Sequence, residues 1–351
     1  MAKIIVGMSG GVDSAVAAYL LRMAGHDVFG VTLRTWLGSS RCCEIDDARR
    51  VCDMLQIPYY AVNCAAQFRE MVTKPFVNSY LRGLTPNPCV ECNRYIKWEQ
   101  LMESMTLVGA EYIATGHYAS VVRLENGRYT VKKAASAAKD QTYMLYKLTQ
   151  EQLARTIMPL GALSKDEVRL IAEKAGLPVA QKKDSQEICF VTDGDYADFV
   201  CSEAQQPIPP EGDFVDTDGN VLGRHSGIIH YTIGQRKGLG IALGYPAYVK
   251  NIDPVNNRVV LARDEELYCS NIECSGLNFM SIEGISAGEN IRALVRIRYH
   301  NAGEWATIES HGEDRVSISF DSPVRAPAPG QAAVFYDEND LVIGGGEITD
   351  N

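Results

Sequence analysis

The chain has 351 residues, of which 46% are hydrophobic, and this is enough for two or three domains with buried cores. Its formal net charge of −10 argues against a protein that coats nucleic acid nonspecifically, but not against one structured RNA on a local basic patch. No apolar run reaches about 18 residues, and residues 1–8 are too short for a signal peptide, so we expect a cytoplasmic protein without a membrane segment. Its 10 cysteines then predict reduced thiols, metal ligands or catalytic groups rather than a disulfide framework.

The first motif along the chain is Ser9-Gly10-Gly11-Val12-Asp13-Ser14, between an apolar run and a helical pattern. A strand, a glycine turn and a helix in this order predict a phosphate-binding loop. The glycines let the backbone approach a phosphate, and the amides and dipole at the helix start favour an anion. Ser9 and Ser14 can donate hydrogen bonds, and Asp13 can hold a magnesium ion or a phosphate-bound water.

Strand and helix patterns alternate after this loop. The sequence predicts strands at 28–33, 59–63 and 112–115, and helices at 46–55, at 65–81 and from a cap at Asn93 to about residue 107. This order predicts an α/β fold with a parallel sheet and a ligand site at the carboxyl ends of its strands. Ser14, Leu33, Gly116 and His117 all fall at or just past such ends.

A hairpin signal follows at 121–131, and two capping boxes start helices at Thr149 and Ser164. The proline-rich stretch 207–210 predicts a linker, and a second break is expected near Ser275-Gly276. Beyond it the chain consists of short β units. We therefore predict an α/β catalytic domain at 1–206 and two small β domains at 207–275 and 276–351, the last one barrel-like.

Two cysteines stand out by their context. Cys92 ends the loop Thr85–Cys92, which we place just before a helix, where a helix start lowers the pKa of a thiol. Cys189 follows Lys182 and Lys183, which could favour its thiolate. Taken singly, either cysteine is more often a buried and inert residue.

Several motifs together carry a family resemblance. They are Ser9–Ser14, Pro86–Pro88 through Cys92-Asn93, Ala114–Tyr118, Lys139-Asp140-Gln141, Ile188-Cys189-Phe190, Gly234–Gly240, Arg298-Tyr299 and Pro329–Gln331. The first resembles the loop of the PP-loop ATP pyrophosphatases. All of them, in order over nearly the whole chain, resemble the MnmA family of tRNA-specific 2-thiouridylases.

The resemblance implies ATP-dependent thiolation of the wobble uridine of tRNA at C2. ATP would adenylate the C2 oxygen, a persulfide on Cys189 would supply sulfur, and Cys92 would act as the nucleophile that ends in a disulfide with Cys189. A sulfur-donor protein and Mg²⁺ are implied as well. The ATP-binding residues would be Gly7, Met8, Ser9, Gly10, Gly11, Val12, Asp13, Ser14, Leu33 and Gly116.

The same resemblance implies residues that contact tRNA. These are Asn87, Pro88, Cys89, His117, Lys139, Asp140, Gln141, Arg298, Tyr299 and Gln331. Without the family, Lys139–Gln141 would be interpreted as a solvated loop. Arg292, Arg296 and Arg298 share one face of a predicted strand, which suits phosphates but also suits the wet face of a barrel. Arg236 and Lys237, between glycines, could approach RNA or form a tight turn.

Cys89 departs from the family, because many members have aspartate there. It creates a Cys89-x-x-Cys92 spacing, which with Cys189 would suit a [4Fe–4S] cluster with one open iron. Cys42, Cys43 and Cys52 could instead complete a zinc site. No other metal site is assigned.

Two further functions stay open at this point. One is a PP-loop amidotransferase or ligase that resembles GMP synthetase or argininosuccinate synthase, although no glutaminase module is visible. The other is a noncatalytic RNA-binding protein, against which the intact Ser9–Ser14 loop and both family cysteines speak.

Overall fold

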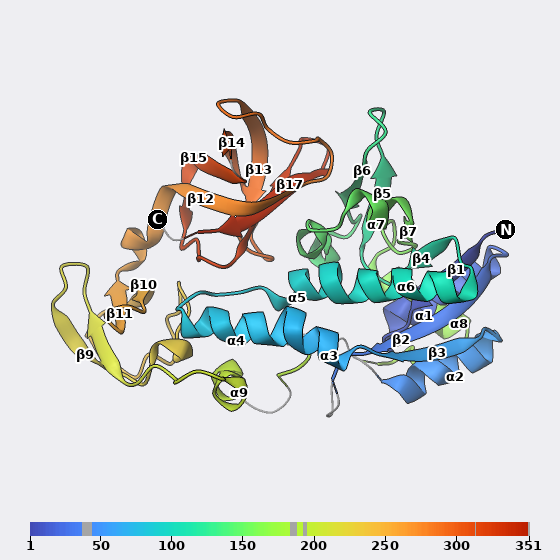
Figure 1. Ribbon diagram of the computed structural model, residues 1–351, viewed down its shortest axis with the longest axis horizontal. Coiled ribbons are helices and arrows are strands. Elements are labelled where there is room, and N and C mark those ends of the chain that lie inside the picture. Colours follow the sequence, from blue (N-terminus) through green and yellow to red (C-terminus); the bar gives the residue numbers. More distant parts are fainter. Residues whose placement is uncertain (37–43, 183–187, 192–194, 313, 350–351) are drawn as a thin grey trace.

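The computed structural model describes residues 1–36, 44–182, 188–191, 195–312 and 314–349. Its amino-terminal part is built on a five-stranded parallel sheet with the order β3-β2-β1-β4-β7 (Figure 1). The strands are β1 (Lys3–Gly7), β2 (Asp27–Arg34), β3 (Tyr59–Asn63), β4 (Tyr112–Ala114) and β7 (Thr156–Ile157). The predicted strands at 28–33, 59–63 and 112–115 are confirmed to within a residue at each end.

Helices cover both faces of this sheet. On one face lie α1 (Val12–Met23), α2 (Ile45–Leu55) and α8 (Lys165–Lys174), and on the other lies α6 (Trp98–Val108). The central strand serves both layers, since Ile4 and Val6 belong to the core with α1 and α8, and Ile5 belongs to the core with Leu101 of α6. Burial on both faces explains why β1 is a continuous apolar run rather than an alternating one.

The helix that carries Cys92 begins earlier than predicted. It starts as α5 (Pro88–Glu91), continues through a π-helical stretch, Cys92–Lys97, and runs on into α6. Asn87 is the cap, and its Oδ1 accepts the Cys89 amide at 3.2 Å. The prediction of a cap at Asn93 is therefore wrong. Pro88 was predicted in a loop, but it occupies the first helical position. A backbone N–H there would have no partner within the helix, so proline loses no hydrogen bond.

The second long helix lies beside this one. It consists of α3 (Ala65–Phe68), a π-helical stretch, Arg69–Thr73, and α4 (Lys74–Leu81), as the prediction of one helix at 65–81 implies. The predicted hairpin is β5 (Ala119–Arg123) with β6 (Tyr129–Lys133). Both capping boxes are confirmed: Thr149 caps α7 (Gln150–Ala154) and Ser164 caps α8.

Two β units complete the chain. After α9 (Tyr196–Glu203) comes a four-stranded sheet with the order β10-β11-β8-β9, and then a closed barrel with the order β12-β15-β14-β13-β16-β17. The sheet strands are β8 (Gly212–Val215), β9 (Val221–His225), β10 (Tyr248–Asp253) and β11 (Arg258–Ala262). The barrel strands are β12 (Tyr268–Phe279), β13 (Asn290–Arg296), β14 (Glu304–Gly312), β15 (Arg315–Arg325), β16 (Ala332–Tyr336) and β17 (Val342–Ile348). The predicted barrel is confirmed.

The break expected near Ser275-Gly276 is not present, because β12 passes through both residues. Gly276 suggested a break between domains. In the structure it has a positive φ and lies at a register shift within the strand. The whole strand belongs to the barrel. We therefore propose that the second domain boundary lies in the short helical turn at 264–267, and the boundary after residue 206 stays a prediction.

The barrel docks on the catalytic part through hydrogen bonds as well as apolar contacts. Arg128 of the hairpin donates to the carbonyls of Phe279 and Met280, both at 2.9 Å. Tyr143 donates its hydroxyl to the carbonyl of Ala332 at 2.8 Å. These partners are more than a hundred residues apart in sequence. The positions of the β5–β6 hairpin and of Tyr143 therefore depend on the barrel as well as on their own sequence neighbours.

Candidate active site

The phosphate-binding loop has the geometry that the motif predicts. Gly10 has φ +77°, and a Cβ there would lie 2.6 Å from the carbonyl oxygen of Glu44. The Ser14 hydroxyl accepts the Ser9 amide at 3.2 Å and donates to the Gly11 carbonyl at 3.1 Å. Gly11 caps α1 without a side chain, so the loop offers backbone amides at the positive end of a helix.

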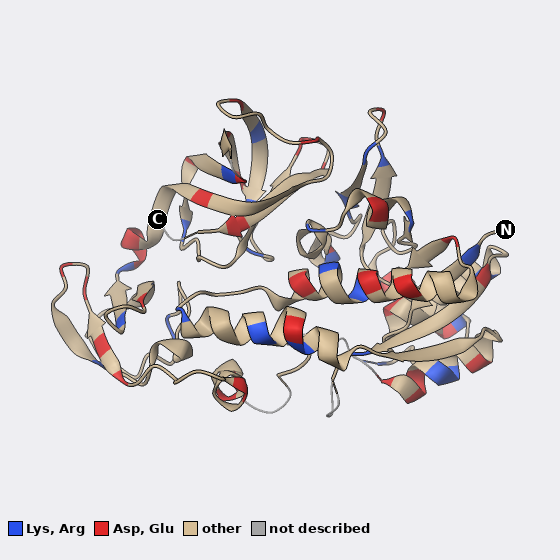
Figure 2. Cartoon of the chain, in the orientation of Figure 1, with Lys and Arg blue, Asp and Glu red and all other residues tan. Residues whose placement is uncertain are grey.

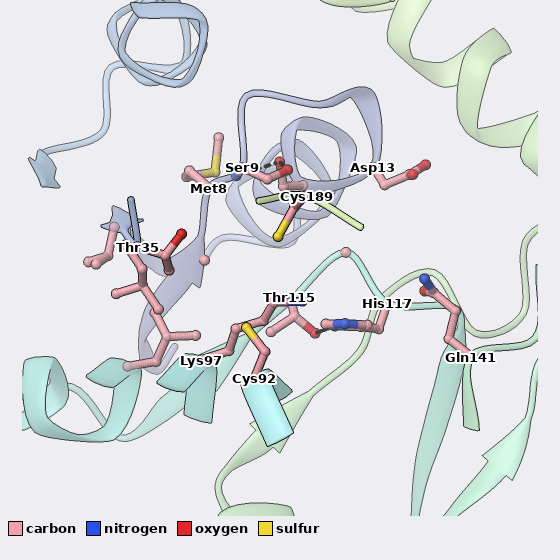
Figure 3. A pocket seen from close by; sticks show the side chains of 16 residues that line it. Met8, Ser9, Asp13, Thr35, Cys92, Lys97, Thr115, His117, Gln141 and Cys189 are labelled. Carbon is pink, nitrogen blue, oxygen red and sulfur yellow. Dashed lines mark hydrogen bonds between the residues drawn. The ribbon is translucent and has the colours of Figure 1, made fainter. Parts of the chain in front are cut away.

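A cavity of about 240 Å³ opens above this loop, at the carboxyl ends of β1, β2 and β4 (Figure 3). The predicted site residues that line it are Gly7, Met8, Ser9, Asp13, Ser14, Leu33, Cys92, Gly116, His117, Gln141 and Cys189. Val31, Thr35, Lys97, Leu101 and Thr115 line it too, and the sequence analysis had not singled them out. Gly116 closes against the loop, since a Cβ there would lie 2.7 Å from the Ser14 nitrogen.

Cys92 and Cys189, which are remote in sequence, meet at this cavity. Cys92 comes from the π-helical stretch and is only 8% exposed. Cys189 is half-buried, and the next residue, Phe190, anchors its segment among Phe68, Phe76 and Phe199 at ring separations of 4.9–5.6 Å. Both sulfurs face the cavity (Figure 3). No disulfide joins them, so the predicted disulfide stays a prediction.

Lys182, the first of the two lysines before Cys189, has its partners beside the phosphate-binding loop. Lys182 donates to the Gly10 carbonyl at 3.0 Å and to Asp47 at 2.7 Å, and also pairs with Glu44. Its charge is therefore engaged with two carboxylates beside the loop, and its effect on the Cys189 thiol stays a prediction. Lys183 lies outside the described residues.

Asp13 has two partners that were missed. Lys165, at the start of α8, donates to both carboxylate oxygens at 2.8 and 2.9 Å, and the Tyr118 hydroxyl donates to one of them at 2.7 Å. Asp13 is the only carboxylate among the described residues that line the cavity. The capping box at Ser164 marks the helix start that places Lys165, but no local signal links it to a residue 152 positions away.

His117 is held neutral by its surroundings. Burial and then the nearby charge of Lys97 lower its pKa well below the ordinary value. Its Nδ1 lies 2.9 Å from the Thr115 hydroxyl, and its ring packs against that of Trp98. The Gln141 side chain accepts the Tyr118 amide at 2.9 Å. The residues on either side of His117 are therefore held, Thr115 by the imidazole and Tyr118 by Gln141.

The other residues predicted to contact tRNA lie outside the cavity, and several have internal partners. Asp140 is buried and pairs with Arg296 at 2.9 Å, and Arg298 donates to the carbonyls of Ile233 and Ala326. Gln331 donates to the Thr85 carbonyl, and Pro88 is buried at the helix start. Lys139 and Tyr299 are half-buried and Cys89 is exposed. Their contacts with tRNA stay predictions.

The three arginines on and just after β13 do not form an open row of cations. Arg292 pairs with Asp321 on the barrel surface at 2.6 and 2.8 Å, while Arg296 and Arg298 have the partners given above. The strand alternation was predicted correctly, since Ala293, Val295 and Ile297 are buried in the barrel. The outer face is nevertheless covered in part by the catalytic and central domains. The three guanidinium groups therefore do not form an open row, and a contact of Arg298 with tRNA stays a prediction.

The thiolates do not form a metal site in this arrangement. Among the described residues, no three His, Cys, Asp or Glu side chains are grouped so that they could hold a metal ion. Cys92 and Cys189 line the cavity, but Cys89 does not. The residues therefore do not fit a cluster on all three cysteines. Cys42 and Cys43, invoked for a zinc site, lie outside the described residues.

Comparisons with known proteins agree over the full chain. Three family profiles match in order: a tRNA methyl transferase HUP domain at residues 2–193, a tRNA methyl transferase PRC-barrel domain at 197–263 and an aminomethyltransferase β-barrel domain at 270–348. The tRNA-specific 2-thiouridylase MnmA of Lachnoclostridium phytofermentans is 52% identical and is matched over 99% of both chains. The chain belongs to the MnmA family. The MnmA of Clostridioides difficile is 47% identical over 99% of this chain and 98% of its own.

A more distant likeness is found among solved structures. The U34-tRNA thiolase NcsA of Methanococcus maripaludis, solved with its [4Fe–4S] cluster, matches with a TM-score of 0.37 and 22% identity, over 57% of this chain and 63% of that one. At this TM-score we draw no inference about mechanism from it. In the described part of the MnmA-family chain, no helix is both long enough and apolar enough to span a membrane.

Proposed function

We propose that this chain uses ATP to thiolate the wobble uridine of tRNA at C2, with a persulfide on Cys189 as the sulfur source. The observation that carries the proposal is that Cys92 and Cys189 line one cavity with the phosphate-binding loop. The reaction needs ATP at the C2 oxygen of the uracil and a sulfur nucleophile at C2 itself. Here the phosphate-binding loop and the two thiols line the same cavity. An amidotransferase would not need two thiols there, and a noncatalytic RNA-binding protein would need neither.

The first step is adenylation. The uracil O2 attacks the α-phosphorus of ATP, and pyrophosphate leaves. The amides at the start of α1 and the Ser9 and Ser14 hydroxyls would hold the phosphates. Mg²⁺ would neutralise phosphate charge when bound, and Asp13 is the carboxylate placed to hold it. Lys165, which donates to Asp13, would stabilise the negative charge that develops on the leaving pyrophosphate.

The second step is sulfur transfer. The terminal sulfur of the Cys189 persulfide attacks C2, and AMP leaves with the C2 oxygen. The Cys92 thiolate then attacks the Cys189 sulfur, the S–S bond breaks, and 2-thiouridine departs with the terminal sulfur. The products are the thiolated base and a Cys92–Cys189 disulfide. The buried position of Cys92 keeps this exchange away from solvent thiols.

The partners follow from the same chemistry. The tRNA would bind across the cavity mouth, and a sulfur-donor protein would load Cys189. We place the reaction in the cytoplasm, where thiols stay reduced. The net charge of −10, with Lys and Arg distributed among Asp and Glu along the chain (Figure 2), favours one local RNA contact over a broad basic face.

The test is thiolation of an unmodified tRNA transcript by iron-free protein with ATP, Mg²⁺ and a persulfide donor, read by mass spectrometry of nucleosides. We expect 2-thiouridine, and its loss in Cys92→Ser and Cys189→Ser, while tRNA binding stays. Cys201→Ser is the matched control, since Cys201 is exposed and does not line the cavity. Product that appears only after anaerobic cluster reconstitution would show that the persulfide route is wrong.

A further inference from the structure

Cys89 and Cys92 form a C-x-x-C pair at the start of one continuous helix. The helix begins at Pro88, with Asn87 as its cap, and Cys92 opens the π-helical stretch. Side chains three apart on a helix lie about 5–6 Å apart at Cβ, and the Cβ atoms of a disulfide lie about 3.5–4.5 Å apart, so the two side chains must approach each other by about 1–2 Å to be joined. Helical side chains also lean toward the preceding turn, which here carries Cys89. In α/β proteins this motif at a helix start is typical of thiol–disulfide exchange.

The two thiols differ in how far solvent reaches them. Cys89 is exposed, whereas Cys92 is 8% exposed and lies in the cavity wall. The proposed reaction leaves a Cys92–Cys189 disulfide at that wall after every turnover. A donor protein must reach Cys189, which is half-buried, but the Cys92 sulfur lies deeper and is the harder one for a protein reductant to attack. A surface thiol beside Cys92 would carry the oxidation from Cys92 to the outside of the protein.

We infer that Cys89 is the resolving thiol that opens the Cys92–Cys189 disulfide after each sulfur transfer. This inference rests on the function proposed above. The Cys89 thiolate attacks the Cys92 sulfur, the Cys92–Cys189 bond breaks, and Cys189 leaves as a thiolate ready for a new persulfide. The exchange involves no net oxidation. The new Cys89–Cys92 disulfide then receives two electrons from an external dithiol, which becomes a disulfide itself.

The position of Cys89 suits this role in a second respect. It occupies the second position of the helix, and the Asn87 Oδ1 that accepts its amide at 3.2 Å fixes that turn. The positive end of the helix dipole favours a thiolate there over a thiol. Cys92 lies one turn further along and gains less from the dipole. When the Cys89–Cys92 disulfide is reduced, the negative charge is therefore better placed on the Cys89 sulfur than on the Cys92 sulfur.

Disulfide mapping after one turnover tests the inference directly. The protein is loaded with persulfide, given ATP, Mg²⁺ and tRNA without a reductant, quenched in acid and alkylated. Cleavage after Arg and Lys releases residues 83–94 with both Cys89 and Cys92, and residues 184–224 with Cys189 and Cys201, which fragmentation of the joined peptides distinguishes. We expect an internal disulfide in the first peptide of the wild type. In Cys89→Ser we expect the two peptides to be joined through Cys92 and Cys189.

Kinetics give the second readout. In Cys89→Ser we expect the steady-state rate with a protein dithiol to fall about tenfold more than the rate of the first turnover, because only recycling needs the resolving thiol. A small dithiol that enters the cavity should restore part of the steady-state rate. Cys201→Ser removes another exposed thiol and should change neither rate.

The outcomes separate this inference from the proposed function. A wild-type protein that thiolates tRNA once but keeps only the Cys92–Cys189 linkage would overturn the role of Cys89. Equal effects of Cys89→Ser on the first turnover and on the steady state would also overturn it, and would make Cys89 a tRNA contact. Absence of thiolation in the first turnover would instead contradict the proposed function itself.

Discussion

Asp140→Asn should loosen the barrel from the catalytic domain rather than remove a contact with RNA. The Asp140 side chain is 2% exposed and pairs with Arg296 of β13 at 2.9 Å, where the Arg296 side chain is 11% exposed. The carboxylate also accepts the Thr142 hydroxyl at 2.9 Å and the Ala134 and Thr142 amides at 3.3 Å. Asparagine keeps the shape of the residue, but it removes the charge that faces the guanidinium.

The expected magnitude follows from burial. Breaking a buried ion pair by removing one partner costs about 3–5 kcal/mol, because it leaves an uncompensated charge. Arg296 would keep its contacts with the carbonyls of Tyr299 and Asn301, so the lower figure applies. About 3 kcal/mol corresponds to roughly a hundredfold change in an opening equilibrium, at 1.36 kcal/mol per decade.

Hydrogen exchange can read this change at the interface itself. The Lys133 amide donates to the Asp340 carbonyl, and the Thr85 amide donates to the Pro329 carbonyl, so both cross between the domains. Their exchange should be about a hundredfold faster in Asp140→Asn, while amides of β1 and β2 should not change. The same substitution in the exposed pair of Asp321 with Arg292 is the control and should change exchange little.

The result that would refute this reasoning is equally specific. Wild-type exchange at Lys133 and Thr85 in Asp140→Asn, together with weaker tRNA binding, would make Asp140 an RNA contact. Arg296→Met, alone and combined with Asp140→Asn, completes a double-mutant cycle. If the two residues act as a pair, the double variant should be less destabilised than the sum of the single variants.

The other predictions concern the cavity. Lys165→Ala should slow tRNA-dependent ATP–pyrophosphate exchange about a hundredfold, because it leaves the charge of Asp13 unbalanced beside the phosphates, whereas exposed Lys174→Ala on the same helix should not. Gly116→Ala should weaken ATP binding measured by calorimetry, since its Cβ would strike the loop, whereas Gly284→Ala has open space and should be neutral. The lowered pKa of His117 means that below about pH 6.5 the unfolded chain binds a proton that the folded chain refuses, so stability falls as pH falls. In His117→Asn this fall, measured by urea unfolding between pH 5 and 7 against the wild type, should be shallower by up to about 1.4 kcal/mol per pH unit; an unchanged slope would contradict a neutral His117 imidazole in the folded chain.

The parts of the fold that depend on neighbouring residues could be predicted from the sequence. The loop at Gly10, the strand β3 and the capping boxes at Thr149 and Ser164 each depend on a few adjacent residues, and the structure has all of them where the pattern places them. The cap at Asn87 was missed, and Asn93 predicted in its place, for a local reason too, since prolines before a helix and within a loop look alike in sequence.

What could not be predicted are contacts between distant segments. Alternation along β13 tells which side chains face outward, but not that another domain lies over Arg296. Likewise nothing near Asp13 indicates Lys165, and nothing near Cys92 indicates Cys189. The family resemblance supplied the pairing of the two cysteines, but the structure supplied the difference in burial between Cys89 and Cys92, from which a recycling route follows.

The same distant contacts connect barrel docking to the sulfur chemistry. Gln331 of the barrel region donates to the Thr85 carbonyl at 2.8 Å, just before Asn87 caps the helix that carries Cys92. In the next turn Glu91 pairs with Lys147 at 2.6 Å. The direction in which this helix starts, and with it the position of the Cys92 sulfur, is therefore set partly from the barrel side. A variant such as Asp140→Asn, which loosens the barrel, should accordingly slow sulfur transfer more than adenylation, because the phosphate-binding loop is held by contacts within the catalytic domain, whereas the start of the Cys92 helix is held in addition by Gln331 from the barrel side.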